Sequence, residues 1–185
     1  MNIYINDIKE RNNIRTDDEL DILIDIVASA VGSLTNPSKL SNSFKSMSQK
    51  TLSDKTIKLY LDYLTDAFLI EKAVRFNVKG KKYIDSPSKY YFEYVGLRNA
   101  RLNFRQQEEN HIMENIIYTE LRSRGYRVDV GVVEIYETSS HGKSQKKQLE
   151  VDFIANKDNH KYYIQSAFEM SSSEKIEQEK DHLIN

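Results

Sequence analysis

Residues 148–155 read Gln-Leu-Glu-Val-Asp-Phe-Ile-Ala, and this stretch decides the fold of the second half of the chain. Apolar and acidic side chains alternate along it, in the order Leu149, Glu150, Val151, Asp152, Phe153. Alternation with a period of two is typical of a β-strand that buries one face. We therefore expect a strand over residues 148–156, with Asp152 on the opposite face from its apolar neighbours.

A second strand is expected over residues 161–169, where Gln165 and Ala167 stand two positions apart. A carboxylate on one strand, followed by an acid-x-lysine pair on the next, is the layout of a two-strand nuclease site. Oxygen ligands there hold Mg²⁺ on the phosphate, and a lysine steadies the attacking water. Gln165 stands at the place of the second acid and Ala167 at the place of the lysine. The sequence therefore has the strand arrangement of such a site but lacks its second acid and its lysine.

The remaining candidate for this site is Glu114, on a helix expected over residues 106–124 and ended by Gly125. We expect Glu114, Asp152 and Gln165 to converge at one end of the sheet as the catalytic set. Asp152 and Gln165 would be the metal ligands, and Mg²⁺ the cofactor if the site is active. Further candidates exist for the acids, Glu134 and Glu150, and for the missing lysine, Lys161 and Lys175.

The first half of the chain shows helical spacing. Helices are expected over residues 17–31 and 39–47 and after Ser53, followed by strands over 70–77 and 81–85. Three helices followed by a two-stranded ribbon are the outline of a winged helix-turn-helix. The alternative is a small helical bundle with a hairpin. One more helix, polar in composition, is expected over residues 174–184.

The expected hairpin carries a basic cluster, whose candidate nucleic-acid-binding members are Arg75, Lys79, Lys81 and Lys82. Such a cluster suits a phosphate backbone, so DNA is a candidate partner. The alternative is that the lysines keep the hairpin soluble and prevent edge-to-edge pairing.

Composition and the lack of certain motifs exclude several classes of protein for this chain. The chain has 185 residues, a net charge of −1 and no cysteine. The lack of cysteine excludes disulfides and thiolate metal sites, and it fits a cytoplasmic protein. No apolar run approaches the ~18 residues of a membrane span. No Gly-x-x-x-x-Gly-Lys-[Ser/Thr] loop is present, so we expect no ATP hydrolysis by this chain.

An ordered series of short motifs runs along nearly the whole chain. In order, the motifs are Thr-Ile-Lys-Leu-Tyr-Leu-Asp-Tyr-Leu at 56–64, Ala-Phe-Leu-Ile at 67–70, Lys-Tyr-Tyr-Phe at 89–92, Gly-Leu-Arg-Asn-Ala at 96–100, Met-Glu-Asn at 113–115 and Glu-Val-Asp-Phe at 150–153. This series resembles the region that follows the ATPase core in a large prokaryotic group of AAA+ ATPases, known as domain of unknown function 4143.

The resemblance implies an α+β protein of two domains. A winged-helix-like domain would cover residues 1–95, and a PD-(D/E)xK nuclease-like α/β domain would cover residues 96–185. Only three strands are expected in the second domain, so we expect its sheet to be incomplete. Because the sequence ends directly after an expected helix, without a polar tail, we also expect the chain to be a piece of a longer protein. The resemblance also implies an upstream ATPase domain as partner.

Two departures from the family pattern bear on activity. This chain has Glu93-Tyr94-Val95 where the family often has Asp, and Gln165-Ser166-Ala167 where many members have Glu-Val-Lys. The positions that match the nuclease pattern are Glu114, Asp152 and Gln165. The second departure implies a degenerate nuclease site.

Three functions follow as hypotheses. The first is a non-ATPase C-terminal region of an AAA+ ATPase, which acts in nucleic-acid binding or in regulation and assembly. The second is an active Mg²⁺-dependent nuclease, and the third is a protein-interaction module alone. The missing lysine favours the first over the second. The sequence leaves the oligomeric state open.

Overall fold

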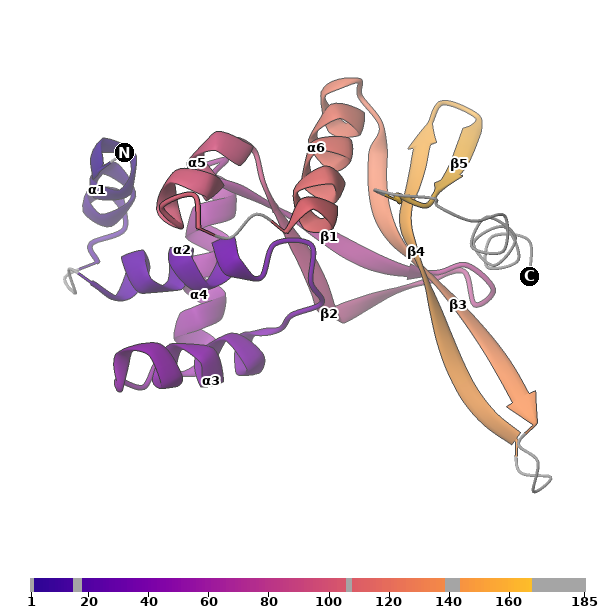
Figure 1. The fold of residues 1–185 in the computed structure, drawn as a ribbon, viewed down its shortest axis with the longest axis horizontal. Helices are drawn as coiled ribbons and strands as arrows, with labels where there is room; N and C mark the ends of the chain where they lie inside the picture. The colour runs from indigo at the N-terminus through magenta and orange to yellow at the C-terminus, as the bar shows by residue number, and fades with distance from the viewer. Residues whose placement is uncertain (1, 15–17, 106–107, 139–143, 168–185) are drawn as a thin grey trace.

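The computed structural model describes residues 2–14, 18–105, 108–138 and 144–167 (Figure 1). These residues form six helices and five strands in a mixed α+β fold. In chain order the elements are α1 (Asn2–Arg11), α2 (Glu19–Ser29), α3 (Pro37–Ser48), α4 (Asp54–Asp66), β1 (Ile70–Asn77), β2 (Lys82–Phe92), α5 (Val95–Arg101), α6 (Glu109–Ser123), β3 (Arg127–Thr138), β4 (Ser144–Lys157) and β5 (His160–Ile164). The expected helix over 174–184 lies outside the described residues.

Local sequence sets the ends of the helices. Asn36 caps α3 by accepting a hydrogen bond from the backbone N–H of Lys39 at 2.8 Å. Ser53 caps α4 by accepting one from the backbone N–H of Thr56 at 3.1 Å. Both side chains satisfy a donor that a helix start leaves free. Gly125 follows α6 with a φ of +81°, so its predicted role as the residue after the helix is confirmed.

One sheet joins the two halves of the chain. The strand order is β2-β1-β3-β4-β5, with β1 and β3 parallel and all other neighbours antiparallel. The expectation of a three-stranded, incomplete sheet is wrong, because the β1–β2 hairpin extends it to five strands within the described residues. The pairing of Arg75 with Val130 thus crosses the boundary expected near residue 95. The division into two domains stays a prediction.

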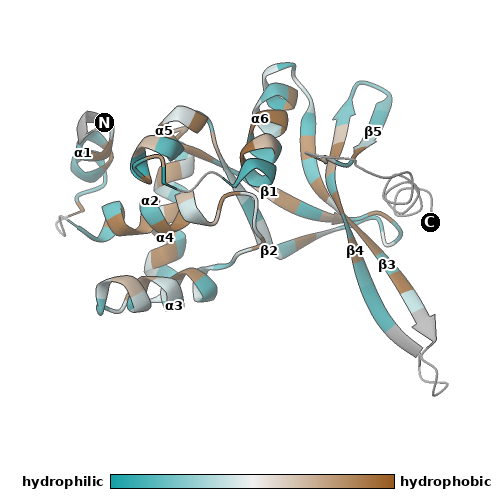
Figure 2. Cartoon of the chain, in the orientation of Figure 1, coloured by the Kyte–Doolittle hydropathy of each residue, from teal (hydrophilic) through white to brown (hydrophobic). Residues whose placement is uncertain are grey.

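Helices α1 to α5 gather at the end of the sheet formed by β2 and β1, whereas α6 lies over the sheet, and β3 and β4 project away from the helices as a long two-stranded arm (Figure 1). The colouring in Figure 2 is hydrophilic along the part of β4 that forms this arm. Large apolar side chains from α2, α3 and α4 are fully buried, among them Leu23, Phe44 and Leu64. None of the described helices is long and apolar enough to cross a membrane.

Helix α6 packs on one face of the sheet through aromatic rings. Tyr118 of α6 stacks on Tyr91 of β2 with ring centroids 4.4 Å apart. Phe153 of β4 contacts both rings, at 5.9 Å and 6.2 Å. Stacked and tilted aromatic pairs of this kind stabilise beyond the area that they bury. They fix α6 over β2 and β4, where the candidate site lies.

A bulge interrupts the alternation of β4. Between its pairings with Asp129 and Gly131 of β3, β4 advances three residues, from Ile154 to Val151. Both of these β4 side chains lie against Gly131, where an added Cβ would come within 2.8 Å of the Val151 Cβ. Strict alternation across residues 149–153 is therefore a wrong prediction. Val151 and Ile154 face away from α6, and the residues between them belong to the bulge.

Candidate functional site

A buried lysine lies at the centre of the charged cluster between α6, β2 and β4. The Nζ atom of Lys89 is 2.9 Å from Oε2 of Glu114 and 2.8 Å from Oε1 of Glu150. The hydroxyl of Tyr91 donates to the same Glu114 oxygen at 3.1 Å. The Lys89 side chain is only 4% exposed. We call Lys89, Tyr91, Glu114 and Glu150 the lysine cluster.

Asn115 fixes the position of Glu114. Its side chain is buried and bonds both backbone groups of Phe92: Oδ1 accepts from the N–H at 2.8 Å, and Nδ2 donates to the C=O at 2.7 Å. These two hydrogen bonds fix the position of α6 along the length of β2. Glu114, the preceding residue, is thereby held beside Lys89 and Tyr91.

Gly32 allows the chain after α2 to approach the lysine cluster closely. Its φ is +70°, and an added Cβ would lie 2.8 Å from Nδ1 of His111 and 3.2 Å from Oε2 of Glu114. Any larger residue would be strained in this conformation and would press on both side chains. The close approach helps to exclude water from the carboxylate of Glu114.

Burial and charge act in opposite directions within the lysine cluster. Burial alone would lower the pKa of Lys89, but the charges of Glu114 and Glu150 outweigh it, and the pKa is raised. Burial raises the pKa of Glu114, and the Lys89 ammonium and Tyr91 hydroxyl only partly offset it. Burial also raises the pKa of Tyr91, with Glu114 adding to the effect. The cluster keeps its lysine charged and penalises ionisation of its buried acid.

Asp152 lies beside the lysine cluster and is bonded by the segment after β5. Its Oδ2 atom accepts from the backbone N–H of Ser166 at 2.8 Å and from the Ser166 hydroxyl at 2.7 Å. Gln165 accepts a hydrogen bond from the backbone N–H of Asp152 at 3.3 Å through its Oε1 atom. The structure thus brings Asp152 and Gln165 together, and internal donors occupy oxygens that a metal would need.

The lysine of the cluster comes from an unexpected strand. Ala167, at the expected lysine position, is exposed and follows β5. Lys161 lies over the ring of Phe76, 5.7 Å from its centroid. Lys175 lies outside the described residues. The cation next to Glu114 is instead Lys89 of β2, which stands 25 residues before Glu114 in the sequence.

The acids are not arranged as a metal site in the described residues, where no three His, Cys, Asp or Glu side chains could hold an ion together. Glu114 and Glu150 both pair with Lys89. Glu134, a further candidate, pairs with Lys146 on the arm at 2.7 Å. A Mg²⁺ ion at Asp152 and Gln165 would compete with Ser166 for Oδ2 of Asp152 and with the backbone N–H of Asp152 for Oε1 of Gln165. The geometry favours a closed, charge-matched cluster over an open metal centre.

The basic hairpin divides into one buried and three exposed side chains. Arg75 is 7% exposed, and its Nη2 atom donates to Gln148 Oε1 at 2.9 Å. Its side chain is therefore not at the surface, where the expected contact with nucleic acid would need it. Its strand lies inside the sheet, where a side chain next to β3 and β4 is covered. Lys79, Lys81 and Lys82 are exposed at the turn, as a phosphate contact requires.

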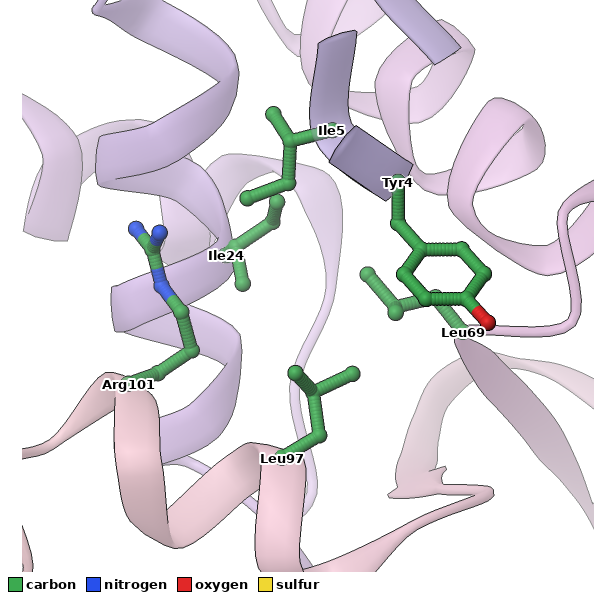
Figure 3. Close-up of a pocket in the computed structure, with 6 residues that line it drawn as sticks. All are labelled: Tyr4, Ile5, Ile24, Leu69, Leu97 and Arg101. Atoms are coloured by element: carbon green, nitrogen blue, oxygen red, sulfur yellow. The ribbon is translucent and has the colours of Figure 1, made fainter. Parts of the chain in front are cut away.

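Two hollows in the surface lie away from the candidate site. The pocket in Figure 3, lined by residues of α1, α2 and α5 and by Leu69 just before β1, holds about 10 Å³, which is room for about one water. A larger open hollow of about 320 Å³ lies between α2 and α3 and is lined in part by Thr35 and Met47. Neither is lined by Glu114, Asp152 or Gln165.

Sequence reasoning missed Lys89, Tyr91 and Ser166 as members of the site. One signal was present: Lys89 precedes three aromatic residues in Lys-Tyr-Tyr-Phe, a run that is typical of a buried strand. A lysine at the start of a buried strand needs a carboxylate partner. The identity of that partner depends on the pairing of β1 with β3, which the local sequence does not show.

The fold and the cluster define a mixed α+β protein with a closed carboxylate–lysine cluster on one face of its sheet. The chain belongs to the family described as domain of unknown function DUF8612, which matches residues 1–108. An uncharacterized protein of Haemophilus influenzae is 37% identical over 168 residues, which are 91% of this chain and 38% of that protein.

A second relative, an uncharacterized protein of Methanocaldococcus jannaschii, is 30% identical over 173 residues, which are 94% of this chain and 36% of that protein. The chain therefore spans well under half the length of these curated relatives. No solved structure matches the chain.

Proposed function

We propose that this chain is a nucleic-acid-binding region, without ATPase activity of its own, of a larger AAA+-type protein. Its nuclease-like site serves structure and assembly. The observation that carries the proposal is the closed lysine cluster, in which Lys89 pairs with Glu114 and Glu150 at 2.9 Å and 2.8 Å. Carboxylates engaged in this way do not offer a metal the open ligands that cleavage requires.

Three further observations support the proposal. The order of three packed helices followed by the β1–β2 hairpin fits a winged helix, and an isolated β-bridge between Thr35 and Ser88 ties the α2–α3 connection to the hairpin. The exposed lysines of the turn fit a phosphate backbone. The greater length of the relatives leaves room for an ATPase domain.

A binding titration tests the proposal. Lys79, Lys81 and Lys82 would be changed together to Gln, and the affinity of wild type and variant for a labelled duplex and a labelled single strand measured over a salt series. We expect the variant to bind more weakly and to show a flatter dependence on log salt, by about 0.7–0.9 for each phosphate that the protein no longer neutralises. Binding that is absent in the wild type, or unchanged in the variant, would contradict the proposal.

The second candidate, a Mg²⁺-dependent nuclease, is favoured by Lys89. A lysine beside Glu114 and near Asp152 is the type of cation that the nuclease layout needs, and it would serve where Ala167 stands at the expected lysine position. In that case a substrate and metal would have to separate Lys89 from its two carboxylates. The two candidates differ in one outcome: only the second predicts metal-dependent cleavage that needs Asp152.

A further inference from the structure

Aromatic and cationic side chains alternate across the sheet on a face distant from the lysine cluster. Arg127 lies over the ring of Tyr83 at 5.5 Å, and Tyr83 contacts Phe76 edge-on at 5.1 Å. Lys161 of β5 lies over the ring of Phe76 at 5.7 Å. Tyr163 follows two residues after Lys161 on β5. We call these five residues the aromatic face.

The strand registers place the aromatic face on the side of the sheet opposite α6. Phe76 pairs with both Tyr83 and Gly131, and Ile154 lies against Gly131 on the side away from α6. Tyr163 pairs with Ile154, so both side chains point to that same side. The members of the aromatic face on β2, β1, β3 and β5 therefore lie on one side of the sheet, on the same side as the buried Ile154 of β4.

The aromatic face offers ring surface and positive charge to a partner. Tyr83 is 45% exposed and Tyr163 is 42% exposed. Arg127 and Lys161 are exposed as well. Asp129, a carboxylate next to the face, is 6% exposed, and the Tyr83 hydroxyl donates to its Oδ2 atom at 3.2 Å. The two charged residues of the aromatic face, Arg127 and Lys161, are thus both positive and accessible.

We propose that the aromatic face binds single-stranded nucleic acid, with bases stacked on Tyr163 and Tyr83 and phosphates held by Lys161 and Arg127. The inference rests on the proposed function and names its substrate class and surface. Aromatic rings recognise bases through stacking, which requires bases that are not enclosed in a duplex. The two cations lie over rings of the same face, so they can pair with the phosphates of a strand whose bases stack there.

The face is continuous with the basic turn. Lys82, next to Tyr83 on β2, pairs with Asn77, and alternation turns its side chain to the other side of the sheet. Lys79 and Lys81 lie in the same turn. A nucleic-acid strand bound to the aromatic face can therefore continue past Lys79 and Lys81, which would add charge contacts without stacking.

Fluorescence anisotropy with a labelled single strand of roughly 20 nucleotides tests the inference, beside the duplex of the same sequence. The full chain is compared with Tyr163→Ala, Tyr163→Phe and Lys161→Gln. The matched control is Tyr136→Ala, because Tyr136 is a 71% exposed tyrosine of β3 on the opposite side of the sheet. Thermal melting of every variant excludes unfolding as a cause.

We expect Tyr163→Ala to weaken binding of the single strand about tenfold, since one base no longer has a ring to stack on. Tyr163→Phe and Tyr136→Ala should bind as the wild type does, and the duplex should bind more weakly than the single strand. If Tyr163→Ala and Lys161→Gln bind normally while the variant of the turn lysines does not, the inference is overturned and the proposed function stands. If no form binds nucleic acid, both are overturned, and the face serves another class of partner.

Discussion

The two faces of the sheet use charge in different ways. On the α6 face, Lys89 is 4% exposed and has carboxylates at 2.9 Å and 2.8 Å. On the opposite face, Arg127 and Lys161 are exposed and lie over aromatic rings at 5.5 Å and 5.7 Å. The first arrangement satisfies its charges within the chain. The second leaves them available to a partner.

Burial is the cause of this difference. A cation removed from water must be matched by internal anions and hydrogen bonds, because its hydration is lost. A cation at the surface keeps its hydration and pairs with a ring at little cost. Charge on the α6 face is therefore expected to govern stability, and charge on the aromatic face to govern binding.

The largest effect is expected from Lys89→Met. The substitution leaves Glu114 and Glu150 without their cation, and we expect the free energy of unfolding to fall by about 3 kcal/mol. This is the low end of the range for a broken buried pair, because Glu150 is 34% exposed and screened by water. Urea unfolding measures it, and the double variant Lys89→Met with Glu114→Gln should recover part of the loss.

The control for Lys89→Met is Lys146→Met, which breaks an exposed pair with Glu134 and should leave unfolding unchanged. Equal stability of Lys89→Met and wild type would show that the lysine cluster does not hold α6 on the sheet.

The next effect concerns the aromatic face. Arg127→Gln with Lys161→Gln removes two exposed cations, and we expect the affinity for a single strand to fall about tenfold with a flatter salt dependence. Urea unfolding should be nearly unchanged, since neither cation is buried. Reduced stability with unchanged binding would reverse the roles that we assign to the two faces.

A smaller effect is expected from Ser166→Ala. It removes the hydroxyl that donates to Asp152 at 2.7 Å but keeps the backbone donor at 2.8 Å. We expect a decrease of about 1 kcal/mol in unfolding free energy, as for one hydrogen bond to a charged group with the other retained. A more stable Ser166→Ala variant would mean that the hydroxyl does not stabilise Asp152.

The smallest effect is a pH dependence that comes from Glu114. Its pKa in the folded state is raised above the ordinary 4.5 by burial, so the folded protein holds this proton more tightly than the unfolded chain. The stability that this provides is complete below pH 4.5 and is lost as the pH rises through the folded pKa. Unfolding measured across this window should therefore decline less with pH in Glu114→Gln than in wild type. Parallel profiles would refute this.

Local patterns in the sequence predict the elements better than their assembly. The cap residues Asn36 and Ser53 and the terminator Gly125 act within one turn of their helices, so their roles follow from the sequence. The short helices α1 and α5 were not predicted. Helix α5 is held by two arginines that contact α2: Arg98 donates to the Ala28 C=O at 2.9 Å, and Arg101 pairs with Asp25 at 2.6 Å. Such helices depend on tertiary contacts.

The candidate site was predictable only in part. Glu114, Asp152 and Gln165 lie near one another in the structure, although β4 does not alternate strictly and Gln165 lies just after β5. The bulge in β4 and the presence of Lys89 in the site could not be predicted from the sequence. Both depend on pairings between strands that are distant in sequence, β1 with β3 and β3 with β4.

A cleavage assay tests the central claim most directly. The purified chain and its Asp152→Ala variant would be incubated with labelled single-stranded and duplex DNA and RNA in Mg²⁺ and in Mn²⁺, under conditions where anisotropy shows the wild type to be bound. The account predicts bound but intact substrate, with no difference between the two proteins. Metal-dependent cleavage by the wild type that Asp152→Ala abolishes would contradict it and establish the nuclease instead.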